Sequence, residues 1–267
     1  MTRENRLRRA RLFFLTPFVL ALFAGCAHAP GRLLWRGAAP VDAEARQALD
    51  ALARAQDMLG SLRGQGTCIA ASQDVMGKRK FNVTLLYRAP RDVAVRGFDS
   101  TGLSGQVLRL VAVDGTLEVA IPETALDVSE MLGRAGADSI ARELMRPEEW
   151  GKLGGREVKV ANVEETGDGR RLTLLVNKRF GLLRRVTLEG PDWKLRESEL
   201  LDKRGAVLAR VEWQEYLEVG GVRAPVAFAA AFPQEGLTLR FSLEGSKVAI
   251  NPGLTTADFL AQPEEMK

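Results

Sequence analysis

The chain has 267 residues, a formal net charge of +4 and a single histidine. The excess charge lies in residues 1–25, where five arginines stand against one glutamate, so the rest of the chain is close to neutral. This balance removes the main support for nucleic-acid binding. Because the histidine, His28, lies near the N-terminus, the remaining chain lacks the residue needed for Ser-His-Asp or Cys-His catalysis and for most zinc sites.

The N-terminal region has the layout of a secretory signal peptide, with a basic start and an apolar run from Leu12 to Ala24. This run is shorter than the roughly 20 residues that a membrane-spanning helix needs. The segment from Leu22 to Cys26 resembles the bacterial lipobox, in which the cysteine is lipidated and becomes the first mature residue. We therefore interpret residues 1–25 as a lipoprotein signal peptide and Cys26 as the lipidation site. The alternatives are a signal peptide cleaved elsewhere and an uncleaved anchor.

Residues 26–39 lack periodicity and predict a short tether. From Pro40 to Leu62, apolar residues recur at steps of three and four and predict a helix, with Asp42 as its N-cap and Gly64 at its end. Cys68, the second cysteine, is expected to be a small buried apolar residue.

From Gly66 onward the apolar residues alternate with a period of two, which predicts about eleven short strands separated by turn signals. Residues 124–150 interrupt this pattern with two stretches of helical composition. Met131 and Leu144 belong to the apolar face of this insert, which either packs on the core or forms a lid over a cavity. The chain closes with Ile250-Asn251-Pro252 and a predicted short helix at residues 256–260, anchored by Phe259.

These elements predict one mainly β (α+β) domain over residues 40–267. We expect a strongly curved antiparallel sheet whose concave side is covered by the N-terminal helix and the helical insert. Such a sheet either fills its interior or encloses a ligand, and the sequence does not separate these roles. The candidate cavity or core residues are Leu85, Val95, Leu110, Val119, Met131, Leu144, Leu174, Phe228 and Phe241.

The order of elements resembles the lipoprotein-localisation factors LolA and LolB. Three segments carry the resemblance, namely Tyr87 to Arg96, Gly102 to Gly105, and Ile250 to Phe259. The resemblance implies an unclosed β-barrel of about eleven strands with an acyl-binding cavity and helices at its mouth. The anchor at Cys26 is similar to that of LolB, the outer-membrane receptor, since LolA is soluble. Leu103 matches the protruding apolar residue with which LolB helps to insert a delivered lipoprotein.

The resemblance therefore implies a protein that faces the periplasm from the outer membrane and binds acyl chains of lipoproteins or similar lipids. A soluble LolA-like carrier would be the donor. Burial of each methylene contributes about 0.8 kcal/mol, so an apolar cavity alone can hold an acyl chain. Since no covalent chemistry is needed, no cofactor or metal is expected. The alternative is a structural or assembly lipoprotein whose barrel interior is filled. An enzyme is not expected, since Glu148-Glu149 and Glu164-Glu165 do not form an evident acid and base pair.

Overall fold

A computed structural model describes residues 30–72, 78–89, 92–99, 105–113, 116–120, 157–167, 169–177, 182–234 and 236–261. The described strands form one antiparallel sheet of thirteen strands, in the order β1-β7-β8-β9-β10-β11-β12-β13-β2-β3-β4-β5-β6. The helices are α2 (Pro30–Gly37), α3 (Ala43–Met58) and α7 (Thr256–Leu260). The strands are β1 (Ala39–Pro40), β2 (Ser61–Ser72), β3 (Lys78–Arg88), β4 (Asp92–Asp99), β5 (Gln106–Val113), β6 (Thr116–Ala120), β7 (Val158–Thr166), β8 (Gly169–Asn177), β9 (Leu183–Glu189), β10 (Lys194–Leu201), β11 (Val207–Val219), β12 (Val222–Phe232) and β13 (Leu237–Ile250).

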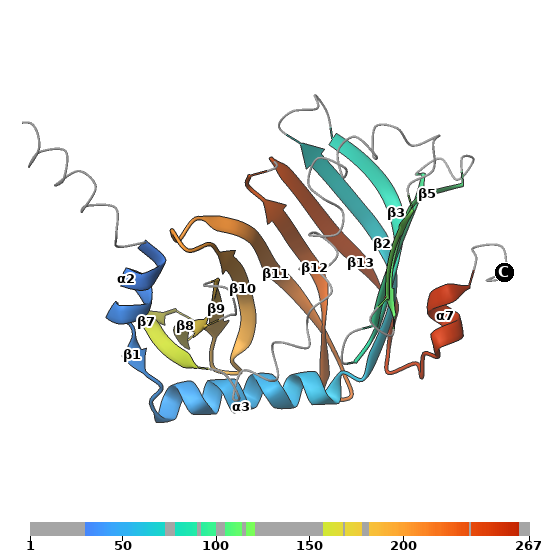
Figure 1. Ribbon diagram of the computed structural model, residues 1–267. Helices are drawn as coiled ribbons and strands as arrows, with labels where there is room; N and C mark the ends of the chain where they lie inside the picture. Colours follow the sequence, from blue (N-terminus) through green and yellow to red (C-terminus); the bar gives the residue numbers. More distant parts are fainter. Residues whose placement is uncertain are drawn as a thin grey trace, which may run out of the picture.

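The sheet is strongly curved and does not close, which confirms the predicted mainly β fold (Figure 1). It consists of two meanders, β7 to β13 and β2 to β6, which meet where β13 pairs with β2. In this pairing Phe241 lies opposite Cys68. Cys68 is 1 % exposed and lies in the main core, as predicted.

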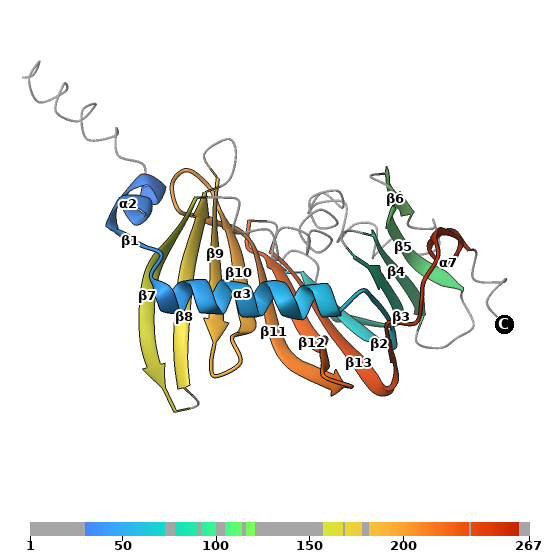
Figure 2. The same cartoon turned by 90° about the horizontal axis from the view of Figure 1, so that it is seen from below.

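Helix α3 lies on the concave side and runs across the strands from β7 toward β12 (Figure 2). Asp42 is its N-cap, as predicted, and its Oδ1 accepts a 2.8 Å hydrogen bond from the Ala45 backbone nitrogen. Ala45, Ala48 and Leu52 form a core cluster with β8 and β9 residues such as Leu174. Small residues at this contact allow the helix to approach the sheet closely.

The predicted end of this helix was wrong, because α3 ends at Met58, and Leu62 and Gly64 belong to strand β2. The glycines of this strand face the neighbouring β13 at very short range. A Cβ at Gly66 would lie 2.0 Å from the Ser242 backbone oxygen, and one at Gly64 would lie 2.7 Å from a Leu243 methyl group. Gly64 therefore permits strand contact and does not terminate a helix.

Within the predicted tether, residues 26–39, the structure contains elements that were not predicted, namely helix α2 and the first residue of β1. β1 pairs with β7 through Ala39 and Val160. The Lys159 Nζ donates a 3.2 Å hydrogen bond to the Trp35 backbone oxygen and lies 4.8 Å from the centre of the indole ring. Because these contacts join segments more than a hundred residues apart, no local sequence pattern shows them.

Helix α7 confirms the prediction for residues 256–260 and packs on the convex face of β3 to β5 (Figure 1). Phe259, its predicted anchor, is fully buried against Leu86, Ala94 and Val111. These residues alternate with those that face the concave core, so this part of the sheet is covered on both sides.

Several predicted features lie outside the described residues, namely Cys26, Leu103 and the insert at 124–150 with Met131 and Leu144. Val119 is described through its backbone, which pairs with that of Leu110. None of the described helices is both long and apolar enough to cross a membrane.

Candidate functional site, an apolar cleft beneath α3

A cleft of about 190 Å³ lies between the C-terminal half of α3 and the concave face of the sheet. Apolar and aromatic side chains dominate its walls. Its lining consists of Leu52, Ala55, Gln56, Leu59, Leu62, Leu85, Tyr87, Val93, Val95, Trp193, Lys194, Leu195, Val211, Trp213, Tyr216, Arg223, Pro225, Phe228 and Phe241. The cleft is thus suited to an apolar ligand or ligand segment.

Two stacked rings form part of the sheet side of the cleft. Phe228 of β12 and Phe241 of β13 are directly opposite each other in the strand register. Their ring centroids are 4.8 Å apart and their planes differ by 17°. Because cross-strand partners point to the same face of a sheet, this pairing register brings the two rings together.

Trp193 enters the cleft from the turn between β9 and β10. Its φ of 51° is in the left-handed region, which is rare for a large side chain. The indole is nevertheless 9 % exposed and packs in the core cluster beneath α3. Burial of the ring therefore offsets an unfavourable backbone conformation at the wall of the cleft.

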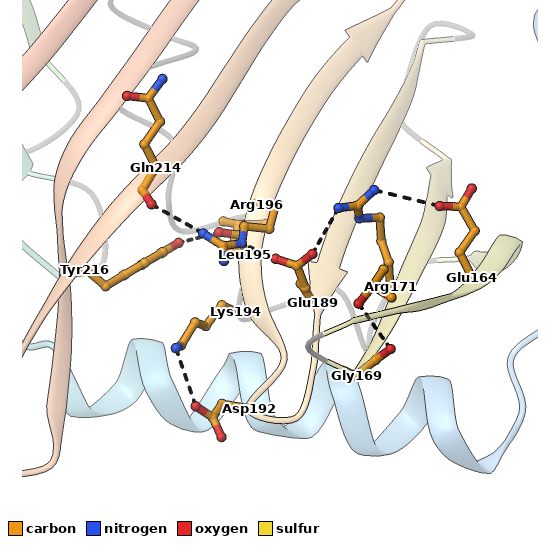
Figure 3. Close-up of polar contacts among 11 residues, drawn as sticks. Glu164, Gly169, Arg171, Glu189, Asp192, Lys194, Leu195, Arg196, Gln214 and Tyr216 are labelled. Carbon is orange, nitrogen blue, oxygen red and sulfur yellow. Dashed lines mark hydrogen bonds and ion pairs between the residues drawn. The ribbon is translucent and has the colours of Figure 1, made fainter.

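The Tyr216 hydroxyl donates a hydrogen bond to the Leu195 backbone oxygen, a contact that joins β11 to β10 (Figure 3). Burial raises the pKa of Tyr216 well above its ordinary value, so the phenol stays a donor at neutral pH. On its other side β11 pairs with β12, and this pairing shifts register between Trp213 and Glu215 and again between Glu215 and Tyr216. Trp213 and Tyr216 both line the cleft although they are three residues apart, which a bulge between them permits.

Lys194 and Arg223 are the charged residues among the described residues that line the cleft. The Asp192 carboxylate lies 3.6 Å from the Lys194 Nζ and accepts a 3.0 Å hydrogen bond from Arg223. Figure 3 shows Lys194 and Asp192 turned toward each other at the turn before β10. These three residues therefore form a charged edge on an otherwise apolar cavity.

A second hollow of about 440 Å³ adjoins the cleft and shares Ala55 and Arg223 with it. Its walls are more polar than those of the cleft. They come from α3, from the turn between β9 and β10, and from the turn between β11 and β12. The remaining lining residues are Ala51, Arg54, Asp57, Met58, Asp192 and Gly221. The apolar cleft and this more polar outer groove thus share Ala55 and Arg223 as wall residues.

Outside the cleft, Glu189 joins three strands (Figure 3). It accepts a 3.0 Å hydrogen bond from Arg171 of β8 and pairs with Arg196 of β10, whose guanidinium also donates to the Gln214 backbone oxygen. Burial opposes ionisation, but the hydrogen bonds from Arg196 and Arg171 prevail and lower the pKa of Glu189. This cluster stabilises the sheet, and Glu164 joins it through a 3.8 Å ion pair with Arg171.

Of the residues predicted to lie in a cavity or a core, some line the cleft and others lie in the packed core. Leu85, Val95, Phe228 and Phe241 line the cleft. Leu110 belongs to the main core and Leu174 to the core beneath α3. Their roles in ligand binding stay predictions, as do those of Val119, Met131 and Leu144.

Sequence analysis missed the aromatic and basic residues of the cleft, including Trp193, Trp213 and Arg223. Trp193 follows Gly190-Pro191-Asp192, a turn signal that could have placed it outside the strand. Within the described part of the chain, no three or more His, Cys, Asp or Glu side chains are grouped so that they could hold a metal ion.

No protein-family model matches the sequence, and no curated protein matches it. Solved structures do match the fold. A LolA superfamily protein from Nitrosomonas europaea has a TM-score of 0.52 at 11% identity, over 80% of this chain and 96% of that chain. This chain has a LolA-like fold.

Two further structures share the LolA-like fold. A domain named as an outer membrane lipoprotein-sorting protein from Vibrio parahaemolyticus has a TM-score of 0.51 at 12% identity, over 80% of this chain and 96% of that chain. A DUF1329 family protein from Desulfovibrio piger has a TM-score of 0.51 at 8% identity, over 83% of this chain and 98% of that chain. Identities this low establish the fold and not the activity.

Proposed function

We propose that this protein binds acyl chains in the bacterial cell envelope and holds them in the cleft beneath α3. The observation that carries the proposal is the apolar wall of the cleft, to which the sheet contributes the stacked Phe228 and Phe241 rings and α3 contributes Leu52 and Ala55. Similarity to a lipoprotein-sorting domain and to a LolA superfamily protein supports it. Burial of each methylene in such a cleft contributes about 0.8 kcal/mol, so binding needs no covalent step.

The volume of the cleft limits how much ligand it holds as it stands. At about 190 Å³ it exceeds the engineered cavity of ~150 Å³ that binds benzene, and it is below the ~300–1,000 Å³ typical of ligand pockets. A segment of one acyl chain fits this space, whereas several complete chains do not.

The finer proposal concerns a LolB-like role. The lipobox-like segment before Cys26 supports a lipid anchor, and Gly102 to Gly105 supports an apolar insertion loop at Leu103. In this proposal the protein faces the periplasm from the outer membrane, receives lipoproteins from a LolA-like carrier and inserts them into the membrane. Ala27, which follows the lipidated cysteine, supports release from the inner membrane by analogy with sorted lipoproteins.

The cleft is tested with residues 27–267, which include every described element. Native mass spectrometry detects co-purified lipid, and displacement of a fluorescent acyl probe by a triacylated lipopeptide measures affinity. We expect Ala55→Phe, which fills the cleft, to weaken probe binding by about tenfold or more. Ala53→Phe, the same change on α3 at a position outside the lining, is the matched control.

A second candidate is a structural or assembly lipoprotein without lipid cargo, and the modest volume of the cleft favours it. If the unmodified chain retains no lipid and does not bind the probe, acyl binding is contradicted and this candidate takes its place. The search for partners then moves to proteins of the outer membrane.

The membrane steps are tested in cells. Cys26→Ala is expected to move the protein from the membrane fraction to the soluble periplasmic fraction, and recovery in the membrane would contradict the anchor. Leu103→Glu is expected to leave probe binding intact and to impair the insertion of delivered lipoproteins. Normal insertion by this variant would contradict the role of Leu103.

A further inference from the structure

The described charged side chains that line the cleft are positive, whereas the carboxylates lie in the outer groove. Lys194 and Arg223 line the cleft itself, and both are cationic. Among the described residues, the carboxylates that line either hollow are Asp192 and Asp57, and both belong to the outer groove. A ligand whose chain enters the cleft therefore meets two cations at the boundary between apolar and polar walls.

The cation of Arg223 lies at the point where the two hollows join. Its side chain is 20 % exposed, and it lines both the cleft and the outer groove, as Ala55 of α3 does. A guanidinium in this position can donate two parallel hydrogen bonds to a carboxylate or phosphate. Arg54 adds a further cation to the outer groove.

In the absence of a ligand, Asp192 forms ion pairs with both Arg223 and Lys194. Its carboxylate is 3.0 Å from Arg223 and 3.6 Å from the Lys194 Nζ. Glu218 lies farther from Arg223, at 3.9 Å. The Asp192 side chain is 49 % exposed on a turn, so its ion pairs are weak and an incoming anion can replace it at small cost.

We propose that Lys194 and Arg223 bind the anionic headgroup of a single-chain amphiphile whose acyl chain occupies the cleft, and that Asp192 holds these cations when the site is empty. This inference rests on the proposed acyl binding and adds the ligand class. The 190 Å³ volume selects a single chain, and the outer groove gives the headgroup access to water. A fatty acid and a phosphate-bearing lipid share this chemistry.

The test compares ligands that have the same chain and different headgroups. Isothermal titration calorimetry of residues 27–267 is carried out with dodecanoate, dodecyl phosphate, dodecanol and dodecyltrimethylammonium, each below its micellar concentration. We expect at least one anion to bind about tenfold tighter than dodecanol, and the cation to bind weakest. Preference for dodecanoate indicates a fatty acid, and preference for dodecyl phosphate indicates a phospholipid-type headgroup.

Three variants separate recognition from folding. Lys194→Gln combined with Arg223→Gln is expected to reduce the ratio of anion affinity to dodecanol affinity to within about twofold. Asp192→Asn is expected to strengthen anion binding severalfold, which a merely destabilised protein cannot do. Arg240→Gln, an exposed position on strand β13 outside both hollows, is the control and should change nothing.

The failures are distinguishable. If dodecanol binds as tightly as both anions, the headgroup site is overturned while acyl binding stands. If Asp192→Asn leaves anion affinity unchanged or lowers it, the role of Asp192 is overturned. If none of the four ligands binds, the proposed function fails and the headgroup site fails with it.

Discussion

Asn251 and Ser61, which are 190 residues apart in the chain, are joined by a 2.9 Å hydrogen bond from the Ser61 backbone nitrogen to the Asn251 Oδ1. The same carboxamide donates through Nδ2 to the Met58 backbone oxygen at 2.9 Å. Met58 ends α3 and Ser61 begins β2, so one C-terminal side chain fixes the connection between the cleft helix and the sheet.

The Asn251 contact gives the first prediction. Asn251→Ala removes both hydrogen bonds and leaves an alanine at a φ of 53°, so we expect a loss of about 1–3 kcal/mol in the free energy of unfolding. Asn251→Gly removes the bonds but tolerates this φ, and its loss should be smaller. Urea denaturation measures both, and a variant as stable as the parent protein would show that the carboxamide is dispensable.

Arg96 is expected to be essential for the attachment of α7. Its buried guanidinium donates to the backbone oxygens of Asp258 and Phe259, at 2.8 and 2.9 Å. Burial and the nearby Arg109 and Arg63 lower the pKa of Arg96. Arg96→Met should cost about 2–4 kcal/mol because it leaves two backbone acceptors at the helix end without this donor.

Arg63→Gln is the control for Arg96. Arg63 is also bonded to α7, through a 3.0 Å ion pair with Asp258, but its side chain is 44 % exposed. We expect its removal to cost less than about 1 kcal/mol. Equal losses at the two positions, measured by thermal unfolding, would contradict the importance of the buried donor.

Gly66 should tolerate no side chain. Its Cβ would lie 2.0 Å from the Ser242 backbone oxygen, so Gly66→Ala must separate β2 from β13 and should cost at least about 1–3 kcal/mol. Gly245→Ala in β13 is the matched control, because nothing lies within 4 Å of its added Cβ. Guanidinium denaturation distinguishes them, and similar midpoints would indicate that the strands can move apart freely.

Cys68 should make stability fall at alkaline pH. Burial raises the pKa of its thiol from 9.0 to about 12. Above pH 9 the unfolded chain loses the thiol proton while the folded chain keeps it, so the contribution present below pH 9 decreases as pH rises toward 12.

At pH 10 this difference in ionisation amounts to about 1 kcal/mol. Cys68→Ala should unfold with a weaker pH dependence over this range, although it loses packing at every pH. Urea titrations at several pH values compare the two proteins. Parallel pH profiles would contradict the assignment, as would rapid alkylation of the native thiol.

Local periodicity was sufficient for much of the fold. Alternating residues predicted the strands, Asp42 predicted the start of α3, and the C-terminal pattern predicted a helix anchored by Phe259. Each of these features depends on neighbours within a few residues. The same alternation placed Phe228 and Phe241 on inward faces but could not show that their strands pair with this register.

The errors share one cause. Gly64 was interpreted as a helix end because glycine often terminates helices. In the structure it lies in β2, where the absence of a side chain leaves room for Leu243 of β13. Ala39 and Pro40 form a strand through their pairing with Val160 and Lys159 of β7, which no local pattern shows. Trp193 and Arg223 come from different strands and turns, and they meet at the cleft only after the sheet has curved.

The sequence by itself determined the fold class, because the alternation of apolar residues along strands is a local property. Only the tertiary structure decided which apolar residues face a cavity and which fill the core, since both obey the same period of two. It also decided the sign of the charges at the cleft. Asp192 and Lys194 come from the β9–β10 turn and the start of β10, whereas Arg223 comes from β12, on the other side of β11. The strand order that brings them together depends on long-range pairing.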